Sequence, residues 1–243
     1  MSYRLNALAP KYIARACEAF KVKLIHISTD YVFSQFSENG ICKLYPAEFS
    51  NLAEEFPCNM YGLHKLIGEQ FIEKEMKRSA NYMCLRISWL YGNHNNKSFV
   101  HKFLKNVYQA IKENKTEVEM TENEVSVPTS TVCMNCYISK IIHNFNKMKI
   151  LNLHHFHAVP KTDNGKGVSR VEFAEEILKL FGTYEGIKFD SIKVKPIQRE
   201  TYQPTFSAMK TSFENFPNWK TYLRGFITAH KYDIMQWLKT VKN

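Results

Sequence analysis

Two spacings of apolar side chains alternate along the chain, and together they predict its fold class. Residues 22–28 and 82–91 are short, largely apolar runs, which are typical of strands buried in a parallel sheet. Residues 61–77 carry apolar side chains at every third or fourth position, and this spacing predicts a helix with one buried face. Because strands that alternate with helices of this length are typical of α/β proteins, we expect an α/β fold with a parallel sheet.

The same reasoning assigns the remaining segments. Residues 31–59 have no sustained period and are expected to form a loop. Ser169 and Glu172 have the spacing of a capping box, which predicts a helix over residues 169–180. Further helices are expected at residues 5–20, 98–113, 128–145 and 229–241, and further strands at residues 117–121, 150–159 and 191–196.

Composition and charge narrow the class of protein and of partner. With 243 residues, 44% hydrophobic, and only 9 Gly and 8 Pro, the chain is neither a disordered tail nor a collagen-like fibre. A net charge of +10 favours an anionic partner such as a phosphorylated metabolite, and its scattered distribution argues against nucleic acid. No run approaches the ~18 apolar residues of a membrane span, and the N-terminus has no signal-peptide core. We therefore expect no membrane partner and a cytoplasmic location.

The 6 cysteines are expected to be reduced thiols, because no secretory signal is present. Cys133 and Cys136 have the C-x-x-C form, and three histidines follow within residues 154–157. A zinc site needs four converging ligands, whereas these cysteines fall on a helical stretch and the histidines on a strand with alternating faces. We expect buried thiols and strand histidines, and no metal site.

The sharpest local pattern is Tyr61 followed four residues later by Lys65 on the expected helix. Residues four apart share a helix face, so the phenol and the ammonium are neighbours. A free phenol has a pKa of about 10, and a nearby ammonium lowers that pKa by stabilising the phenolate. Such a pair is suited to deliver a proton to a carbonyl oxygen. The alternative interpretation is an exposed tyrosine packed against a lysine side chain.

Two further segments are expected at the same edge of the sheet. The strand at residues 22–28 leads directly into Thr29 and Asp30, and the next strand leads into Trp89. Ligands bind at the carboxyl ends of parallel strands in open α/β sheets. A hydroxyl, a Tyr/Lys pair and a tryptophan able to cover a ring would thus converge on one crevice.

These motifs resemble those of a known family. Ile-Ser-Thr-Asp-Tyr-Val-Phe at residues 27–33, Tyr-Gly-x-x-Lys-Leu-x-Gly-Glu-Gln at residues 61–70 and Leu-Arg-x-Ser-Trp-Leu-Tyr-Gly at residues 85–92 resemble the dTDP-4-dehydrorhamnose reductases. That family belongs to the extended short-chain dehydrogenase/reductase superfamily. Similarity extends to residues 6–10, 123–129, 169–174 and 203–207. The resemblance implies an incomplete Rossmann-like parallel sheet with a small interleaved substrate-binding cap.

The resemblance also implies roles for single residues. Tyr61 would be the general acid that protonates the C4 oxygen of a 4-keto-6-deoxy nucleotide sugar as hydride arrives from NADPH or NADH. Lys65 would lower the pKa of Tyr61 and bind the nicotinamide ribose, so both residues also count as cofactor-binding. Thr29 would orient the keto oxygen. The implied function is an oxidoreductase of dTDP-rhamnose biosynthesis. In the wider superfamily an asparagine that matches Asn6 takes part in a proton relay.

For the substrate, the resemblance implies that Asp30 and Tyr31 line the sugar pocket and that Trp89 stacks over the deoxysugar. The positive net charge suits two doubly charged ligands, a dinucleotide and a nucleotide sugar. The sequence departs from the family pattern at three positions, where the family has Gln, Gly and Arg; here these are Glu124, Ser126 and Gln203. Two of these changes reduce the positive character expected near a diphosphate.

The largest departure concerns the cofactor. Family members open with a strand, a Gly-x-x-Gly-x-x-Gly turn and a helix that holds the cofactor pyrophosphate. The sequence contains no such turn, so we expect that roughly 60–80 residues of the cofactor-binding half are absent from it. Residues 1–92 with about 128–160 would form the Rossmann-like part, and about 93–127 with 161–243 the cap. A homodimer or a complementing N-terminal chain stays open as partner.

Two other readings stay open beside the reductase. One is a non-catalytic, sugar-nucleotide-binding or regulatory module, as the superfamily's regulatory β subunit of methionine adenosyltransferase is; the missing turn favours this reading for the chain alone. The other is a sugar-nucleotide epimerase or dehydratase. A dehydratase usually has Asp and Glu after the strand-end Thr, whereas here Asp30 is followed by Tyr31.

Overall fold

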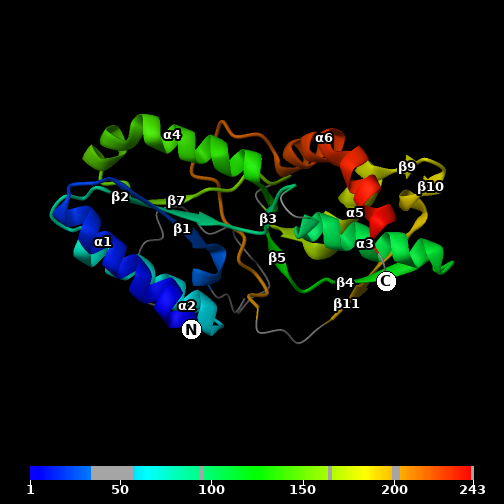
Figure 1. The fold of residues 1–243 in the computed structure, drawn as a ribbon, viewed down its shortest axis with the longest axis horizontal. Helices are drawn as coiled ribbons and strands as arrows, with labels where there is room; N and C mark the ends of the chain where they lie inside the picture. Colours follow the sequence, from blue (N-terminus) through cyan, green and yellow to red (C-terminus); the bar gives the residue numbers. More distant parts are fainter. Residues whose placement is uncertain (34–56, 94–95, 164–165, 199–202, 242–243) are drawn as a thin grey trace.

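A three-stranded parallel sheet lies at the centre of one lobe. The computed structural model describes residues 1–33, 57–93, 96–163, 166–198 and 203–241. Within them the strand order is β1 (Leu24–Thr29), β2 (Tyr82–Ile87), β7 (His155–His157), and all neighbours run parallel. Helices α1 (Ala9–Ala19) and α2 (Met60–Glu75) lie on one face and α4 (Thr131–Ile150) on the other (Figure 1). The expected α/β fold with a parallel sheet is confirmed.

The packing of the middle strand explains why its sequence is largely apolar. Met83 and Leu85 of β2 pack into a buried cluster with α4. Tyr82 and Cys84, which alternate with them, pack against α1 and α2 through Ala14 and its neighbours. A strand covered on both faces favours apolar side chains, and the one charged residue of β2, Arg86, is buried in an ion pair with Glu69.

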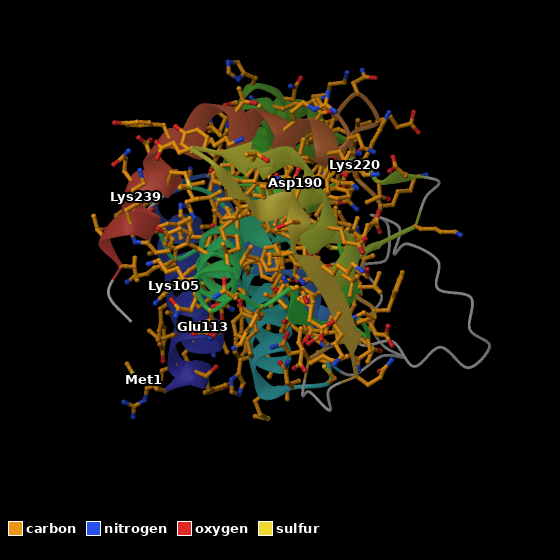
Figure 2. All side chains as sticks on the ribbon, turned by 90° about the vertical axis from the view of Figure 1, so that its right-hand side faces the viewer. Met1, Lys105, Glu113, Asp190, Lys220 and Lys239 are labelled. Atoms are coloured by element: carbon orange, nitrogen blue, oxygen red, sulfur yellow. The ribbon has the colours of Figure 1, made fainter. Side chains whose placement is uncertain are left out.

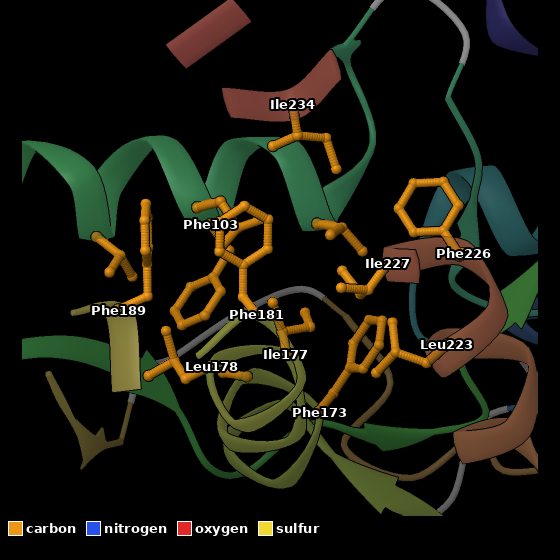
Figure 3. Close-up of a cluster of buried hydrophobic side chains, with 14 of the residues drawn as sticks. Phe103, Phe173, Ile177, Leu178, Phe181, Phe189, Leu223, Phe226, Ile227 and Ile234 are labelled. Atoms are coloured by element: carbon orange, nitrogen blue, oxygen red, sulfur yellow. The ribbon is translucent and has the colours of Figure 1, made fainter. Parts of the chain in front are cut away.

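The outer lobe consists of α3 (Phe99–Lys112), β4 (Glu117–Thr121), α5 (Arg170–Phe181), β11 (Lys193–Ile197) and α6 (Trp219–Thr240). Strands β4 and β11 pair in parallel. Aromatic and branched side chains of the three helices form the largest apolar cluster (Figure 3), with Phe103, Phe173, Phe181, Leu223 and Phe226 among its buried members. This lobe stands beside the central sheet in Figure 1.

Short elements complete the fold. They are the π-helix η1 (Arg4–Leu8), the 3-10 turns η2 (Asp30–Val32) and η6 (Phe189–Ser191), and the strands β3 (Leu90–Tyr91), β5 (Val125–Ser126), β6 (Thr129–Ser130), β8 (Val168–Ser169), β9 (Thr183–Tyr184) and β10 (Ile187–Lys188). β3 pairs in parallel with β6, while β5 with β8 and β9 with β10 are antiparallel. The pairing of β3 with β6 joins the strand that follows β2 to the start of α4.

Several expected boundaries were wrong for identifiable reasons. The strand expected at residues 82–91 breaks after Ile87, and Trp89 has a φ of 36°, which a regular strand does not allow. The strand expected at residues 150–159 shortens to β7, because α4 continues to Ile150. Helix α6 begins at Trp219, well before residue 229, because the Asn218 side chain accepts a hydrogen bond from the Lys220 amide and caps it. Most of the expected loop at residues 31–59 lies outside the described residues.

Two glycines let α2 approach its neighbours closely. A Cβ at Gly62 would lie 2.0 Å from the Tyr31 carbonyl oxygen, so the first turn of α2 lies directly against the end of β1. A Cβ at Gly68 would lie 2.3 Å from the Asn6 carbonyl oxygen of η1. The close approach at Gly62 brings Tyr61 to the carboxyl end of β1.

Charged side chains of both signs spread over the face shown in Figure 2, where Lys105, Glu113, Asp190, Lys220 and Lys239 mark the distribution. Some are paired, as Lys220 is with Asp163 at 2.8 Å. Among the residues the structure describes, no helix is both long and apolar enough to cross a membrane.

Candidate active site

One cavity gathers the candidate residues that the sequence singles out. It has a volume of about 390 Å³ and opens where β1 and β2 end and α2 begins. Its lining includes all six candidates: Thr29, Asp30, Tyr31, Tyr61, Lys65 and Trp89. A larger cavity of about 560 Å³ lies between α5 and β11, away from these groups. We take the smaller cavity as the site because its lining combines a phenol, an ammonium and hydroxyls at the carboxyl ends of parallel strands.

Tyr61 and Lys65 lie one turn apart on α2 but face different partners. The Lys65 ammonium donates to the Ile27 carbonyl oxygen at 2.6 Å and lies 3.3 Å from Nε2 of His26. Burial lowers the pKa of Lys65 and, more strongly, that of His26, to about 4. A neutral His26 can therefore accept a hydrogen bond from the ammonium. The lysine is thus anchored to strand β1.

The expectation that Lys65 lowers the pKa of Tyr61 is not met in this structure. Burial raises the pKa of Tyr61, a hydrogen bond with Thr29 lowers it, and the charge of Asp30 raises it further. Lys65 makes no comparable contribution because its ammonium is directed at the Ile27 carbonyl. Tyr61 therefore carries its proton at neutral pH, and its side chain is 44% exposed towards the cavity and solvent.

Thr29 and Tyr31 complete the wall beside Tyr61. The Thr29 hydroxyl accepts a hydrogen bond from the Tyr31 amide at 3.2 Å. The Tyr31 ring meets the Tyr61 ring edge to face, with centroids 5.9 Å apart. The Tyr31 hydroxyl donates to Oε1 of Gln203 at 2.8 Å, which brings the segment after residue 202 to the rim of the cavity.

Asp30 lies in the lining of the cavity, but its carboxylate is engaged by neighbouring hydroxyls. It is 2% exposed, and its carboxylate accepts hydrogen bonds from the hydroxyls of four residues: Thr29, Ser88, Ser126 and Ser207. Sequence reasoning missed Ser88 and Ser207 as partners. Ser126, which replaces the family's glycine, is one of these donors.

Trp89 is covered on one face by a residue that sequence reasoning also missed. The guanidinium carbon of Arg170 lies 3.5 Å from the centre of the indole, and the Phe173 ring lies nearly parallel to the indole, with centroids 6.4 Å apart. Nε of Arg170 donates to Glu124 at 3.2 Å. Arg170 thus supplies positive charge beside Glu124, one of the positions where the sequence departs from the family pattern. The only signal for it was the similarity at residues 169–174.

A buried ion pair holds α2 against the sheet behind the cavity. Glu69 of α2 and Arg86 of β2 are 2.7 Å apart, and neither is more than 2% exposed. Burial opposes ionisation of Glu69, but the Arg86 guanidinium outweighs it and brings the pKa of Glu69 to about 2. Removing one partner of such a pair leaves an uncompensated buried charge. The pair therefore fixes the helix that carries Tyr61 and Lys65.

The other candidates lie outside the cavity. The amide nitrogen of Asn6 donates to the Ser2 hydroxyl at 3.2 Å. Cys133 is buried and Cys136 exposed on α4. The described part of the chain holds no group of three or more histidine, cysteine or carboxylate side chains arranged to bind a metal ion.

Comparisons with known proteins agree with this geometry. Residues 1–242 match the family described as RmlD substrate binding domain. A dTDP-4-dehydrorhamnose reductase of Mycobacterium tuberculosis is 33% identical over 100 residues, which are 41% of this chain and 31% of that protein. A dTDP-4-dehydrorhamnose reductase of Sinorhizobium fredii is 24% identical over 94% of this chain and 73% of its own length.

Solved structures show the same fold. A dTDP-4-dehydrorhamnose reductase of Clostridium acetobutylicum superposes with a TM-score of 0.73 at 27% identity, over 94% of this chain and 73% of that one. A dTDP-4-dehydrorhamnose reductase of Bacillus anthracis in complex with NADP has a TM-score of 0.70 at 24% identity, over 92% and 71% of the two chains. The sequence match to the Mycobacterium tuberculosis reductase is shorter than these structural matches and spans less than a third of the length of that protein.

Proposed function

Because the chain belongs to the RmlD substrate binding domain family, we propose that it serves the NADPH-dependent reduction of a 4-keto-6-deoxy nucleotide sugar, the reaction of a dTDP-4-dehydrorhamnose reductase. The observation that carries the proposal is the single cavity that Tyr61, Thr29 and Lys65 line together. The reaction class requires a proton donor beside the carbonyl oxygen and a dry, shaped surface for the sugar ring.

In the proposed reaction Tyr61 gives its phenolic proton to the C4 oxygen of the sugar. The raised pKa of Tyr61 keeps that proton in place until a developing alkoxide, a far stronger base, accepts it. Thr29 stands beside the phenol and orients the keto oxygen. The bond that forms is C4–H and the carbonyl π bond breaks, so the ketone becomes a secondary alcohol.

The nicotinamide cofactor, NADPH or NADH, supplies the hydride when bound. The residues present fit its nicotinamide end, since Lys65 reaches the cavity and can donate to ribose hydroxyls with hydrogens not given to Ile27. The pyrophosphate end is different, because the sequence has no glycine-rich turn. Within the described residues β1 pairs only with β2, so its other edge is open to a further strand. A complementing chain that paired there would bring a glycine-rich turn, whereas a second copy would not, because it has the same sequence.

We propose that one lobe faces the cofactor and the other covers the nucleotide sugar. Residues 1–92 and about 128–160 would hold the cofactor-facing groups, and about 93–127 with 161–243 would form the cap over the nucleotide sugar. Trp89 would contact the sugar from the lining of the cavity, with Arg170 on one face of its indole. Arg170 is the cation near the cavity rim that suits a diphosphate.

A second candidate is a non-catalytic module that binds the sugar nucleotide. The anchoring of Lys65 to the Ile27 carbonyl favours it, because the ammonium is directed away from Tyr61. The reductase and the binding module both bind the sugar nucleotide, but only the reductase oxidises NADPH.

The test follows NADPH absorbance with dTDP-4-dehydrorhamnose and the purified 243-residue chain, alongside calorimetric titration of the sugar nucleotide. NADPH oxidation that depends on the sugar and disappears in Tyr61→Phe supports the reductase. Sugar-nucleotide binding without NADPH oxidation supports the binding module. Absence of both contradicts the proposal.

A further inference from the structure

Asp30 is the most densely bonded side chain beside the cavity. Its Oδ2 accepts hydrogen bonds from the hydroxyls of Ser207 at 2.6 Å, Ser126 at 2.7 Å and Ser88 at 3.0 Å. Its Oδ1 accepts from the Thr29 hydroxyl at 3.1 Å. The carboxylate is 2% exposed, so little of it is left to meet a ligand. Burial raises the pKa of Asp30, and the four hydroxyl donors act against it because they stabilise the charged form of the carboxylate.

The serine partners come from segments far apart in the sequence. Ser88 directly follows β2, whereas Ser126 belongs to β5. Ser207 is held beside β5, because its amide donates to the Val125 carbonyl oxygen at 2.9 Å. Strand β5 in turn pairs with β8, the strand that leads directly into α5. Asp30 therefore joins the end of the central sheet to the outer lobe.

The bond to Asp30 also fixes what Thr29 can do. A threonine hydroxyl has one hydrogen to donate and two lone pairs to accept with. Its hydrogen goes to Asp30, and one lone pair takes the Tyr31 amide. The Tyr61 phenol competes for the same hydrogen, because a hydrogen bond from Thr29 lowers the pKa of Tyr61. Asp30 thus holds the Thr29 hydrogen that would otherwise be free for the Tyr61 oxygen.

The charges around the carboxylate act in the same direction. The negative charge of Asp30 raises the pKa of Tyr61 and helps to keep its proton in place. The other charged or titratable groups near Asp30 are Tyr31 and Arg170, and Arg170 is itself paired with Glu124. Lys65 is held by the Ile27 carbonyl. Among the described residues, Asp30 is the acid whose charge raises the pKa of Tyr61.

We propose that Asp30 is a positioning residue and does not bind the sugar. It holds the Thr29 hydrogen and so controls how far Thr29 donates to the Tyr61 phenol, and its bonds to Ser126 and Ser207 couple this arrangement to the position of the outer lobe. For catalysis this inference rests on the proposed reductase function. The arrangement of Asp30, Thr29 and Tyr61 is independent of it and has its own readout.

The activity-independent test measures how fast N-acetylimidazole acetylates Tyr61 at pH 8, followed by peptide mass spectrometry. The reagent attacks phenolate, so a drop of one unit in the Tyr61 pKa raises the rate about tenfold. We expect Asp30→Asn to raise the rate severalfold, because the charge is lost and the Thr29 hydrogen is released to stabilise the phenolate. Exposed Tyr12 is the internal reference, and Asp190→Asn, an exposed acid of η6, is the matched control that leaves the Tyr61 rate unchanged.

A double-mutant cycle separates orientation from charge alone. If Asp30 acts through Thr29, the effect of Asp30→Asn shrinks at least threefold in the Thr29→Val background, while the Thr29→Ser background preserves it. Equal effects in the Val and Thr backgrounds overturn the proposal. A lower melting temperature for Asp30→Asn with an unchanged Tyr61 rate also overturns it, since that is the result for a purely structural residue. If Asp30→Asn fails to fold, Ser207→Ala, which removes one of the four bonds, is expected to raise the Tyr61 rate to a smaller extent, and an unchanged rate overturns the proposal.

Steady-state kinetics provide a second test of the proposal. We expect Asp30→Asn to lower kcat more than tenfold with the KM for the sugar nucleotide within about twofold, which is the signature of lost positioning. A raised KM with unchanged kcat makes Asp30 a sugar ligand and overturns the proposal. If the wild-type chain shows no turnover, the proposed function fails and the acetylation cycle still decides the role of Asp30.

Discussion

The guanidinium carbon of Arg170 lies 3.5 Å from the centre of the Trp89 ring, in van der Waals contact with one face of the indole. The contact joins the first residue of α5 to the loop after β2, at the rim of the cavity. A cation on a tryptophan face contributes about 0.5–2 kcal/mol. Arg170 therefore occupies one face of Trp89 and places a positive charge beside it.

Trp89 and Arg170 are expected to act on the sugar nucleotide more than on the dinucleotide. Trp89→Ala removes the stacking surface and Arg170→Ala removes the cation, and each should raise the Kd for the sugar nucleotide about tenfold, which corresponds to about 1.4 kcal/mol. Because the two side chains touch, the double variant should lose less than the sum. Calorimetry checks this, with Arg224→Ala on the exposed face of α6 as control. Equal losses for NADPH and the sugar nucleotide would contradict the assignment.

Tyr61 is expected to be the proton donor. Tyr61→Phe keeps the ring and its edge-to-face contact with Tyr31 but removes the acidic hydrogen. The turnover number should fall by on the order of 10²–10⁴ while the affinity for both ligands is spared. Steady-state kinetics and ligand titrations measure the two effects, and Tyr12→Phe on the exposed face of α1 is the matched control. Near-normal turnover would show that another group is the acid.

Stability should fall as the pH drops from about 6.5 towards 4. Burial lowers the pKa of both His26 and His155 from 6.5 to about 4. Between these values the unfolded chain binds protons that the folded chain does not, so stability is complete above 6.5 and is lost on acidification. Each histidine contributes a slope of about 1.4 kcal/mol per pH unit within that window.

Urea unfolding at pH 7, 6 and 5 measures this slope. His26→Gln should flatten it, whereas His143→Gln, a change on the outer face of α4, should leave it as in the wild type. A wild-type free energy of unfolding that stays constant across these pH values would show that neither histidine is buried in its neutral form.

Gly62 is expected to tolerate no side chain. A Cβ there would lie 2.0 Å from the Tyr31 carbonyl oxygen, a backbone atom that cannot rotate away. Gly62→Ala should lower the free energy of unfolding by about 1–3 kcal/mol and displace the first turn of α2. Gly225→Ala in α6 is the matched control, since a Cβ there meets nothing within 4 Å, and it should stabilise the protein by up to about 1 kcal/mol. Similar effects of the two substitutions in urea unfolding would refute the close-approach argument.

The sequence was sufficient to bring Thr29, Tyr61, Lys65 and Trp89 together. Two buried strands and one amphipathic helix have clear periods, and residues at the carboxyl ends of parallel strands must share one edge. The direction of each side chain was not accessible in the same way. Helical spacing predicted that Lys65 lies beside Tyr61. Its ammonium instead donates to the Ile27 carbonyl oxygen of β1, a contact that no local sequence pattern predicts.

Partners from distant segments could not be predicted. Arg170 reaches Trp89, and Ser207 reaches Asp30, only because the outer lobe is seated against the end of the sheet. The spacing of these residues along the sequence does not predict where the outer lobe packs against the sheet. The break after β2 was missed for a related reason: the run of apolar residues continues through Leu90, while Trp89 turns the backbone with its positive φ.

The most direct test of the reductase account follows the hydrogen itself. The purified chain is incubated with dTDP-4-dehydrorhamnose and NADPH that carries deuterium at the transferable nicotinamide position, and the sugar product is analysed by mass spectrometry and NMR. We expect deuterium at C4 of the product, and none when Tyr61→Phe replaces the wild type over the same period. Recovery of the unreduced ketone from the wild-type chain, with the sugar nucleotide bound, would contradict catalysis by these residues and leave a binding module.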